Sequence, residues 1–281
     1  MRSYVNFNKS SDYLICFDSD GCVIDTMDIK HSLCFGPQMI RVWQLESWND
    51  EILERWKEIN LYTITRGINR FKGLATALME INEKYTPIEG VEKLYDWAYS
   101  SSELSDSALD RIILQKPNES IFKKALEWSK AVNYDIDNFP IESKRPFPMV
   151  KEALEAASEC ADLAIISSAN ADAIIDEWQT HGIMKYINVM MSQADGSKAF
   201  CLERLISKGY DKNRVIMCGD SPGDMKAAEK CGVHFYPIIV GREAKSWSEF
   251  TSEALGRFFD GCYGGKYEEQ KKKEFLKNLN A

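Results

Sequence analysis

The sequence predicts an α/β protein with a doubly wound (Rossmann-like) parallel sheet and an all-helical domain inserted after the first strand. Short apolar runs, each followed by small or polar residues, alternate with helical patterns in the second half of the chain. Strands that alternate with helices of about 10–15 residues are typical of βαβ units and of parallel sheets. Between residues 28 and 146 the apolar spacing is helical, which predicts the separate helical domain.

The expected strands of the sheet are short apolar runs that suit full burial. They are 13–17, 163–166, 189–191, 215–218 and 233–240. Between them we expect helices at 149–160, 171–181, 198–208 and 223–230. Ligands of such sheets bind beyond the carboxyl ends of the strands, so the polar residues that follow these runs are candidates for a site.

The helical insert divides the sheet domain into two segments of the chain. Its clearest amphipathic stretches are 49–60, 70–83, 90–100 and 120–131. We assign residues 1–27 and 147–281 to the sheet domain and residues 28–146 to the insert. Because two connections at one edge can act as a hinge, we expect the insert to open and close over a site.

Composition and charge limit the class of function. Of 281 residues, 44% are hydrophobic and 28% are charged, as in a globular protein with a sizeable core. The net charge of −8 and the pI near 5.2 argue against binding of nucleic acid or of an anionic membrane, because such surfaces need clustered Lys and Arg. No apolar run is long enough to span a membrane, and the N-terminal stretch lacks a secretory signal pattern. We therefore expect a cytoplasmic monomer or homodimer.

Two further features are expected to be structural. The eight cysteines are scattered without a C-x-x-C pair, and several lie in apolar runs, which predicts reduced and buried thiols. The charged segment 266–281 is expected to form a solvent-exposed helix.

The stretch YLICFDSDGCVIDT ends an apolar run in a group of carboxylates. Asp18 and Asp20 follow the first expected strand, and Asp220 and Asp224 follow another. Acids gathered in a desolvated spot repel one another unless a cation or a proton lies between them, and oxygen ligands without His or Cys favour Mg²⁺. Any one of these acids alone could instead cap a helix or a turn. All of them together at strand ends predict a metal site.

Hydroxyl and ammonium groups follow two other expected strands. Ser167 and Ser168 come after the strand at 163–166, and Lys198 comes after the strand at 189–191. A phosphoryl group needs donors from several sides around a divalent cation, because its negative charge is spread over several oxygens. Each residue alone would more simply be a helix cap or a surface charge. Combined with the acids, they predict a site for phosphoryl transfer.

These motifs resemble, in chain order, the four motifs of the haloacid dehalogenase-like (HAD) superfamily. The matching positions are Asp18-Ser19-Asp20-Gly21, Ser167 after two isoleucines, Lys198 after a loop, and GDSPGD at 219–224. The resemblance covers residues 1–27 and about 147–240, and the insert lies where the family has a helical cap domain. It implies a HAD-like hydrolase of the phosphatase and phosphoglucomutase branch.

The resemblance implies separate roles for the two acids of the first motif. Asp18 would be the nucleophile that forms an aspartyl-phosphate, and its carboxylate would also bind Mg²⁺. Asp20 would be the general acid and then the general base, and its backbone carbonyl would bind Mg²⁺. Members that cleave carbon–halogen bonds typically lack a carboxylate at the second position, so Asp20 favours phosphoester chemistry.

The later motifs would complete the site. Ser167 would donate to the phosphoryl oxygens, and Lys198 would pair with both Asp18 and the phosphate. Asp220 would bind Mg²⁺ directly, and Asp224 would orient a ligand or a water molecule on the metal.

The insert has two segments that are similar to parts of the family's caps. Thr65-Arg66-Gly67-Ile68-Asn69-Arg70 is similar to a basic-Gly-x-Ser/Asn-Arg segment whose Arg reaches a second anionic group, so we expect Arg70, and also Arg66, to bind substrate. The alternative is that both arginines are solvent-facing charges near a helix N-terminus. Lys30 and His31 lie where mutases of the family carry a hinge histidine, with His31 one place out of register.

Together these features predict a Mg²⁺-dependent phosphatase acting on a small phosphorylated metabolite. A phosphomutase similar to β-phosphoglucomutase would use the same Asp18 and Asp20 while protecting the phospho-enzyme from water. A phosphonate-cleaving hydrolase is a further alternative. A binding or regulatory module with this fold is the non-catalytic alternative, although a pure binder would not need the acid at Asp20.

Overall fold

The computed structural model describes residues 4–140 and 143–280, and these form two compact units. The unit that we call the sheet unit ends its first segment at Thr26 and resumes at Pro140; the helical unit is Met27–Phe139. We assigned residues 28–146 to the insert, but the described residues from Pro140 to Pro146 belong to the sheet unit. There, β3 (Arg145–Pro146) pairs antiparallel with β2 (Ile24–Asp25).

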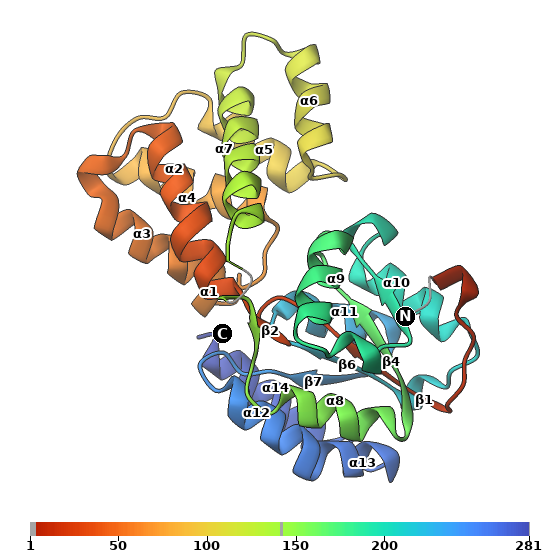
Figure 1. Ribbon diagram of the computed structural model, residues 1–281. Helices are drawn as coiled ribbons and strands as arrows, with labels where there is room; N and C mark the ends of the chain where they lie inside the picture. Colours follow the sequence, from red (N-terminus) through yellow and green to blue (C-terminus); the bar gives the residue numbers. More distant parts are fainter. Residues whose placement is uncertain (1–3, 141–142, 281) are drawn as a thin grey trace. The chain divides into compact units, whose positions relative to one another are not determined.

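The sheet unit contains the doubly wound parallel sheet that the sequence predicts, and the predicted α/β class is confirmed (Figure 1). Its strands, in spatial order, are β5 (Val189–Met191), β4 (Ala161–Ile166), β1 (Tyr13–Phe17), β6 (Val215–Gly219) and β7 (His234–Pro237), all parallel. The last strand is shorter than expected because the ladder stops where its partner β6 ends. The central strand β1 therefore has a neighbour on each side, and its carboxyl end lies in the middle of the sheet edge.

Helices cover both faces of this sheet. They are α8 (Val150–Ser158), α9 (Ala171–Thr180), α10 (Lys198–Ile206), α11 (Pro222–Cys231), α12 (Glu243–Glu249), α13 (Leu255–Phe259) and α14 (Lys266–Asn278). Side chains of β1 alternate between two hydrophobic clusters. Ile15 and Phe17 pack with α8, α9, α12 and α13, while Leu14 and Cys16 pack with α10, α11 and α14.

The C-terminal helix α14 corrects one expectation. We expected a solvent-exposed helix, but Phe275 is 1% exposed and lies, with Leu279, in one of the two clusters. Glu268 accepts a hydrogen bond from the amide of Phe235 at 3.0 Å and lies 2.8 Å from His234 Nδ1. The predicted helix is confirmed, but it is not solvated on every face, and its narrow apolar stripe is easily hidden among many charged residues.

Every regular element of the helical unit is a helix, in agreement with the pattern of the insert. The elements are α1 (Met27–Lys30), α2 (Gly36–Trp43), α3 (Asn49–Lys57), α4 (Arg70–Lys84), α5 (Val91–Ser100), α6 (Asp106–Gln115) and α7 (Ser120–Asp137), with π-helical turns at His31–Phe35 and Glu58–Tyr62. The unit has its own core, in which Trp56, Phe71 and Trp128 are almost completely buried. His31 stacks on Phe35 with ring centroids 4.7 Å apart.

The structure bears on two general expectations, those on the cysteines and on membrane-spanning segments. All eight cysteines are free thiols, and six of them are buried. Among residues 4–140 and 143–280, the helices are all too short or too polar to cross a membrane.

Candidate active site

Asp18 is the first residue after β1, and the parallel register decides what surrounds it. β1 pairs with β4 on one side and with β6 on the other. The amide of Asp18 donates to the carbonyl of Cys218 in β6 at 3.0 Å. Because Ser167 follows β4 and Asp220 follows β6, all three residues lie at the carboxyl edge of the sheet.

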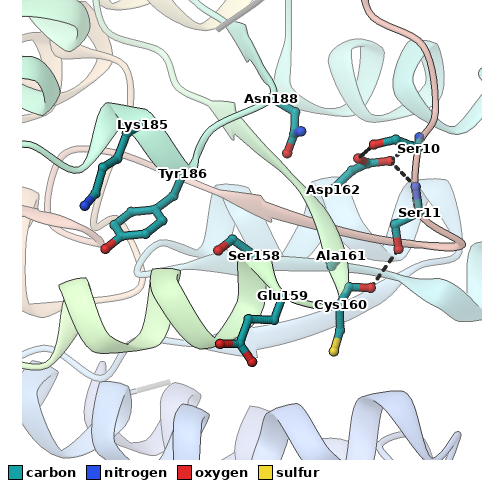
Figure 2. A pocket seen from close by; sticks show the side chains of 10 residues that line it. All are labelled: Ser10, Ser11, Ser158, Glu159, Cys160, Ala161, Asp162, Lys185, Tyr186 and Asn188. Carbon is teal, nitrogen blue, oxygen red and sulfur yellow. Dashed lines mark hydrogen bonds between the residues drawn. The ribbon is translucent and has the colours of Figure 1, made fainter.

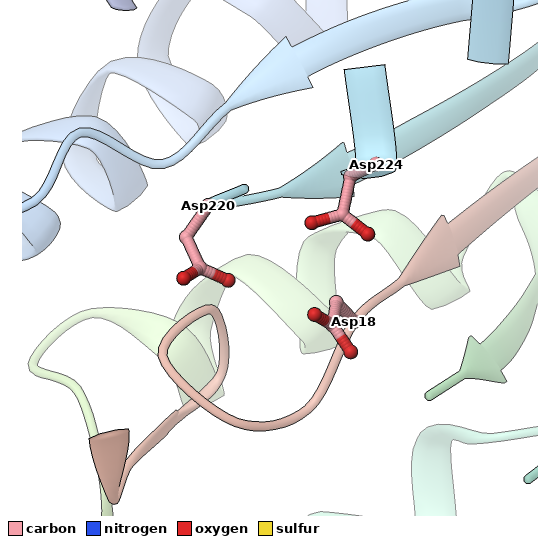
Figure 3. Close-up of side chains that lie close together, drawn as sticks. All are labelled: Asp18, Asp220 and Asp224. Carbon is pink, nitrogen blue, oxygen red and sulfur yellow. The ribbon is translucent and has the colours of Figure 1, made fainter. Parts of the chain in front are cut away.

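Three carboxylates point toward one another at this edge (Figure 3). Asp18, Asp220 and Asp224 each offer an oxygen within 4.8 Å of the other two, and all three residues are buried. The ammonium nitrogen of Lys198 lies 2.5 Å from Asp18 Oδ2 and 2.5 Å from Asp224 Oδ1. When all four groups are ionised, one ammonium leaves two negative charges uncompensated, which is the charge that one divalent cation supplies.

The Asp224 carboxylate is fixed by the start of α11. Its Oδ2 accepts hydrogen bonds from Ser221 Oγ at 2.7 Å and from the Ser221 amide at 3.1 Å, in a capping box. Its Oδ1 bonds Lys198. A Cβ at Gly219 would lie 2.4 Å from the Asp224 Cβ, so the side chain of Asp224 needs the glycine beside it. Both oxygens are thus engaged within the protein, which suits an orienting role.

Asp18 is 6% exposed, and its burial has an electrostatic consequence. Burial raises the pKa of Asp18 to about 8, against the opposing effect of Lys198; Asp224 and Asp220 add to the rise. Burial alone would lower the pKa of Lys198, but Asp18 and Asp224 raise it on balance, so the ammonium stays charged. Burial and the neighbouring acids thus disfavour the ionised form of Asp18, which a bound cation would favour instead.

Asp20 lies on the turn after Asp18 and is not one of the three clustered carboxylates. Its Oδ1 accepts a hydrogen bond from Thr26 Oγ1 at 2.6 Å, and the residue is half-buried. The turn depends on Gly21, whose φ of 78° lies in the left-handed region. Sequence reasoning missed Thr26 as a partner of Asp20, because a threonine six residues away has no motif that marks it.

The serines after β4 differ in exposure. Ser167 is buried; its amide donates to Met191 of β5 at 3.0 Å, and its Oγ accepts from the amide of Ala169 at 3.2 Å. Ser168 is exposed beside it. The turn that contains both leads into α9, whose first residue is Ala171.

The two arginines that we expect to bind substrate belong to the helical unit. Arg66 is 3% exposed, and its Nη1 donates to the carbonyl of Leu61 at 2.9 Å. Arg70 Nη1 donates to Asn133 Oδ1 at 2.6 Å and to Ser129 Oγ at 3.3 Å. The burial of Arg66 contradicts the alternative that it is a solvent-facing charge, and Arg70 is held by α7.

A second polar cluster lies at the amino end of β4 and is structural. It borders a hollow of about 510 Å³ (Figure 2). The carboxylate of Asp162 accepts hydrogen bonds from the amides of Ser10 at 2.8 Å and Ser11 at 2.9 Å, and also from the Tyr210 hydroxyl. This acid accepts hydrogen bonds from several donors of its own chain, so it ties the N-terminal segment to the sheet.

A comparison with family models decides the family. Residues 99–238 match the model described as haloacid dehalogenase-like hydrolase, and this segment includes Ser167, Lys198, Asp220 and Asp224. The chain belongs to the haloacid dehalogenase-like hydrolases. Asp18 lies outside the matched segment, and it joins the site through the pairing of β1 between β4 and β6.

Solved structures agree with this fold. A haloacid dehalogenase-like family hydrolase from Xanthomonas campestris is 12% identical, with a TM-score of 0.52 over 89% of this chain and 93% of that chain. A Lactobacillus delbrueckii subsp. bulgaricus protein, provisionally described as a phosphoglycolate phosphatase, is also 12% identical, with a TM-score of 0.52 over 94% of this chain and 98% of that chain. No curated protein sequence matches. At such low identity the two structures support the haloacid dehalogenase-like fold and not a particular substrate.

Proposed function

We propose that this haloacid dehalogenase-like hydrolase is a Mg²⁺-dependent phosphatase that hydrolyses a small phosphorylated metabolite through an aspartyl-phosphate on Asp18. The observation that carries the proposal is the position of Lys198 Nζ, 2.5 Å from both Asp18 and Asp224 in a buried cluster of acids. Uncompensated buried charge lowers the stability of the folded state, so a contribution to folding stability does not explain this cluster. It is well suited to a cation and a phosphoryl group, whose charges it complements.

Mg²⁺ fits the donor set, because the clustered ligands are carboxylate oxygens and they carry two uncompensated charges. Asp18 and Asp220 would hold the cation through their carboxylates, and Asp20 would hold it through its backbone carbonyl. Asp224 would orient the group around it, since its own oxygens already bond Lys198 and the start of α11. When bound, the cation would neutralise charge on the phosphoryl oxygens.

The chain's own residues would carry out two displacements at phosphorus. In the first, an Asp18 oxygen bonds to phosphorus, the bond to the leaving oxygen breaks, and Asp20 gives that oxygen a proton. In the second, Asp20 takes a proton from water, the water oxygen bonds to phosphorus, and the bond to Asp18 breaks. Inorganic phosphate leaves, and both carboxyl groups return to their starting states.

Further residues would bind the substrate. The hydroxyls of Ser167 and Ser168 and the ammonium of Lys198 would bond the phosphoryl oxygens. We assign recognition of a second polar group of the substrate to Arg70 at the start of α4, with Arg66 in the turn that precedes this helix. Arg70 is already oriented by Asn133 and Ser129, so binding would cost it little further ordering.

A phosphate-release screen tests the proposed function. Sugar phosphates, nucleotides and phospho-acids would each be incubated with the enzyme and Mg²⁺, and then with a chelator in place of Mg²⁺. We expect inorganic phosphate from at least one class, and loss of that release in the chelator. Equal release in the chelator would contradict the metal role, and an isomerised sugar phosphate without free phosphate would instead reveal a mutase.

Mg²⁺ binding is expected to depend on pH through Asp18. In the metal-free protein the pKa of Asp18 is about 8, far above its unfolded value, so the folded state holds a proton that the unfolded state lacks between those two pKa values. Metal-free stability therefore falls as pH rises through this window. Mg²⁺ must displace the proton, so its affinity rises by up to about tenfold per pH unit below the Asp18 pKa.

Thermal unfolding with and without Mg²⁺, at about pH 6 and about pH 8, measures this linkage. We expect the Mg²⁺-induced rise in Tm to be larger at the higher pH. In the Asp18→Asn variant this pH dependence should disappear, because the displaced proton is gone. A Tm rise that is the same at both pH values in the wild-type protein would contradict the proton displacement.

Replacement of Gly219 by alanine is expected to push Asp224 away from Lys198. The new Cβ would lie 2.4 Å from the Asp224 Cβ, and Asp224 is fixed by Ser221. We expect kcat to fall about 10- to 100-fold and stability to fall by about 1–3 kcal/mol. Gly256→Ala is the matched control, since a Cβ there meets no atom within 4 Å. Equal kcat values in the two variants would show that Gly219 does not position Asp224.

A further inference from the structure

Ser19 lies between the proposed nucleophile Asp18 and the proposed acid Asp20. Its backbone amide and its backbone carbonyl both form hydrogen bonds. Its amide donates to Asp18 Oδ1 at 2.7 Å. Its carbonyl accepts hydrogen bonds from the amides of residues 22–24 at distances from 2.9 to 3.3 Å. The second set of bonds closes the turn that starts at Asp20, so the position of Ser19 decides where that turn begins.

The side chain of Ser19 is held by a distant residue. Trp178 of α9 donates from its indole Nε1 to Ser19 Oγ at 2.9 Å, and both residues are fully buried. A second indole supports the same turn, because Trp247 of α12 donates to the carbonyl of Cys22 at 3.1 Å. The turn after β1 is thus tied to two helices of the same hydrophobic cluster rather than left as a free loop.

Of the two indoles, Trp178 is the one linked to the substrate-binding side of the site. Its helix, α9, begins directly after the loop that contains Ser167. The hydrogen bond to Ser19 therefore connects the proposed phosphate-binding loop with the turn that carries Asp20. Such a connection would hold Asp20 in a fixed position relative to the bound phosphoryl group.

We propose that Trp178 is a positioning residue for the general acid, fixing the turn that presents Asp20 through its hydrogen bond to Ser19. The inference rests on the proposed function, in which Asp20 protonates the leaving oxygen. Loss of the indole N–H leaves a buried hydroxyl oxygen without its donor, and the turn relaxes to satisfy it. A shift of about 1 Å in a catalytic group can cost about 100-fold in rate.

The test compares two substrates that differ in their need for an acid. 4-Nitrophenyl phosphate has a leaving group that departs without a proton, whereas an alkyl phosphate needs one. For Trp178→Phe, which keeps a ring but removes the N–H, we expect the rate of the first, enzyme-phosphorylating turnover on the alkyl phosphate to fall about 10- to 100-fold. On 4-nitrophenyl phosphate we expect the first turnover, measured as the burst of 4-nitrophenolate, to slow by less than about threefold, because that displacement needs no proton donor.

Ser19→Ala removes the other partner by deleting one oxygen, so it tests the same bond with little risk to folding. We expect Ser19→Ala and the double variant to show the same substrate-dependent loss as Trp178→Phe, since all three lack one interaction. Tyr263→Phe is the matched control, because it loses a buried hydrogen bond to the Phe235 carbonyl in the same unit. It should lower Tm without a substrate-dependent loss.

Failure of this inference can be told apart from failure of the proposed function. If the wild-type enzyme hydrolyses both substrates and the variants lose the same factor on each, Trp178 has only a structural role and the inference is wrong. The same conclusion follows if Trp178→Phe and Ser19→Ala match Tyr263→Phe. If the wild-type enzyme releases phosphate from neither substrate in Mg²⁺, both the proposed function and the inference are overturned.

Discussion

Replacement of Asp18 by asparagine is expected to lower kcat for phosphate release by at least about 10⁴-fold, because an amide cannot act as the attacking carboxylate. The fold should survive. Asp18 is buried among other acids, and its charged form is disfavoured there, so a neutral amide of nearly the same shape should leave Tm unchanged or raise it. We thus expect Asp18→Asn to lower kcat while Tm either rises or stays the same.

The control for Asp18→Asn is Asp12→Asn. Asp12 is an exposed acid paired with Lys9 at 3.0 Å, and exposed pairs contribute little to stability. Rates of phosphate release and thermal unfolding would be measured for both variants. If Asp18→Asn kept turnover close to that of Asp12→Asn, Asp18 would not be the nucleophile. If it unfolded far below the wild-type Tm, the electrostatic description of the cluster would be wrong.

Lys198→Met is expected to lower both activity and stability. The substitution leaves Asp18 and Asp224 without the ammonium that lies 2.5 Å from each. Removal of one partner of a buried ion pair typically costs about 3–5 kcal/mol. Loss of a preorganised charge at the phosphoryl group should lower kcat/KM by a further factor of about 10²–10³. We expect Mg²⁺ to restore part of the stability but not the rate, since it can neutralise the acids without binding the phosphate as Lys198 would.

Lys245→Met provides the comparison for Lys198→Met. Lys245 forms an exposed pair with Glu249 at 3.5 Å on α12, and its loss should change stability by less than about 0.5 kcal/mol. Denaturant unfolding and steady-state kinetics of both variants would separate the buried lysine from the exposed one. Similar stabilities for the two variants would mean that Lys198 does not hold the acidic cluster together.

The sequence predicted those parts of the structure that depend on local patterns. Buried parallel strands are short apolar runs, and the residues just after them are fixed by the strands' ends, so Asp18 and Asp220 could be placed at one sheet edge. Asp224 and Lys198 belong to helix starts that follow two of these strands. The structure brings these four residues together, although their chemical roles stay proposals.

What the sequence could not predict depends on contacts between distant segments. Trp178 and Ser19 are 159 residues apart, and a tryptophan in an amphipathic helix has no local signal of a buried hydrogen bond. The buried stripe of α14 was hidden by its charged neighbours. The capping box of Ser221 and Asp224 is different, because its Ser-x-x-Asp spacing is visible in the sequence and could have identified how Asp224 is held.

The central claim, that phosphoryl transfer proceeds through Asp18, is tested most directly by trapping the intermediate. The Asp20→Asn variant lacks the base that activates water, so with 4-nitrophenyl phosphate and Mg²⁺ it should accumulate phospho-enzyme. After an acid quench, peptide mass mapping should find one added phosphoryl group on the peptide that contains Asp18, and hydroxylamine should remove it. A phosphoryl group on a serine or a histidine, or turnover without any phosphorylated peptide, would contradict the account.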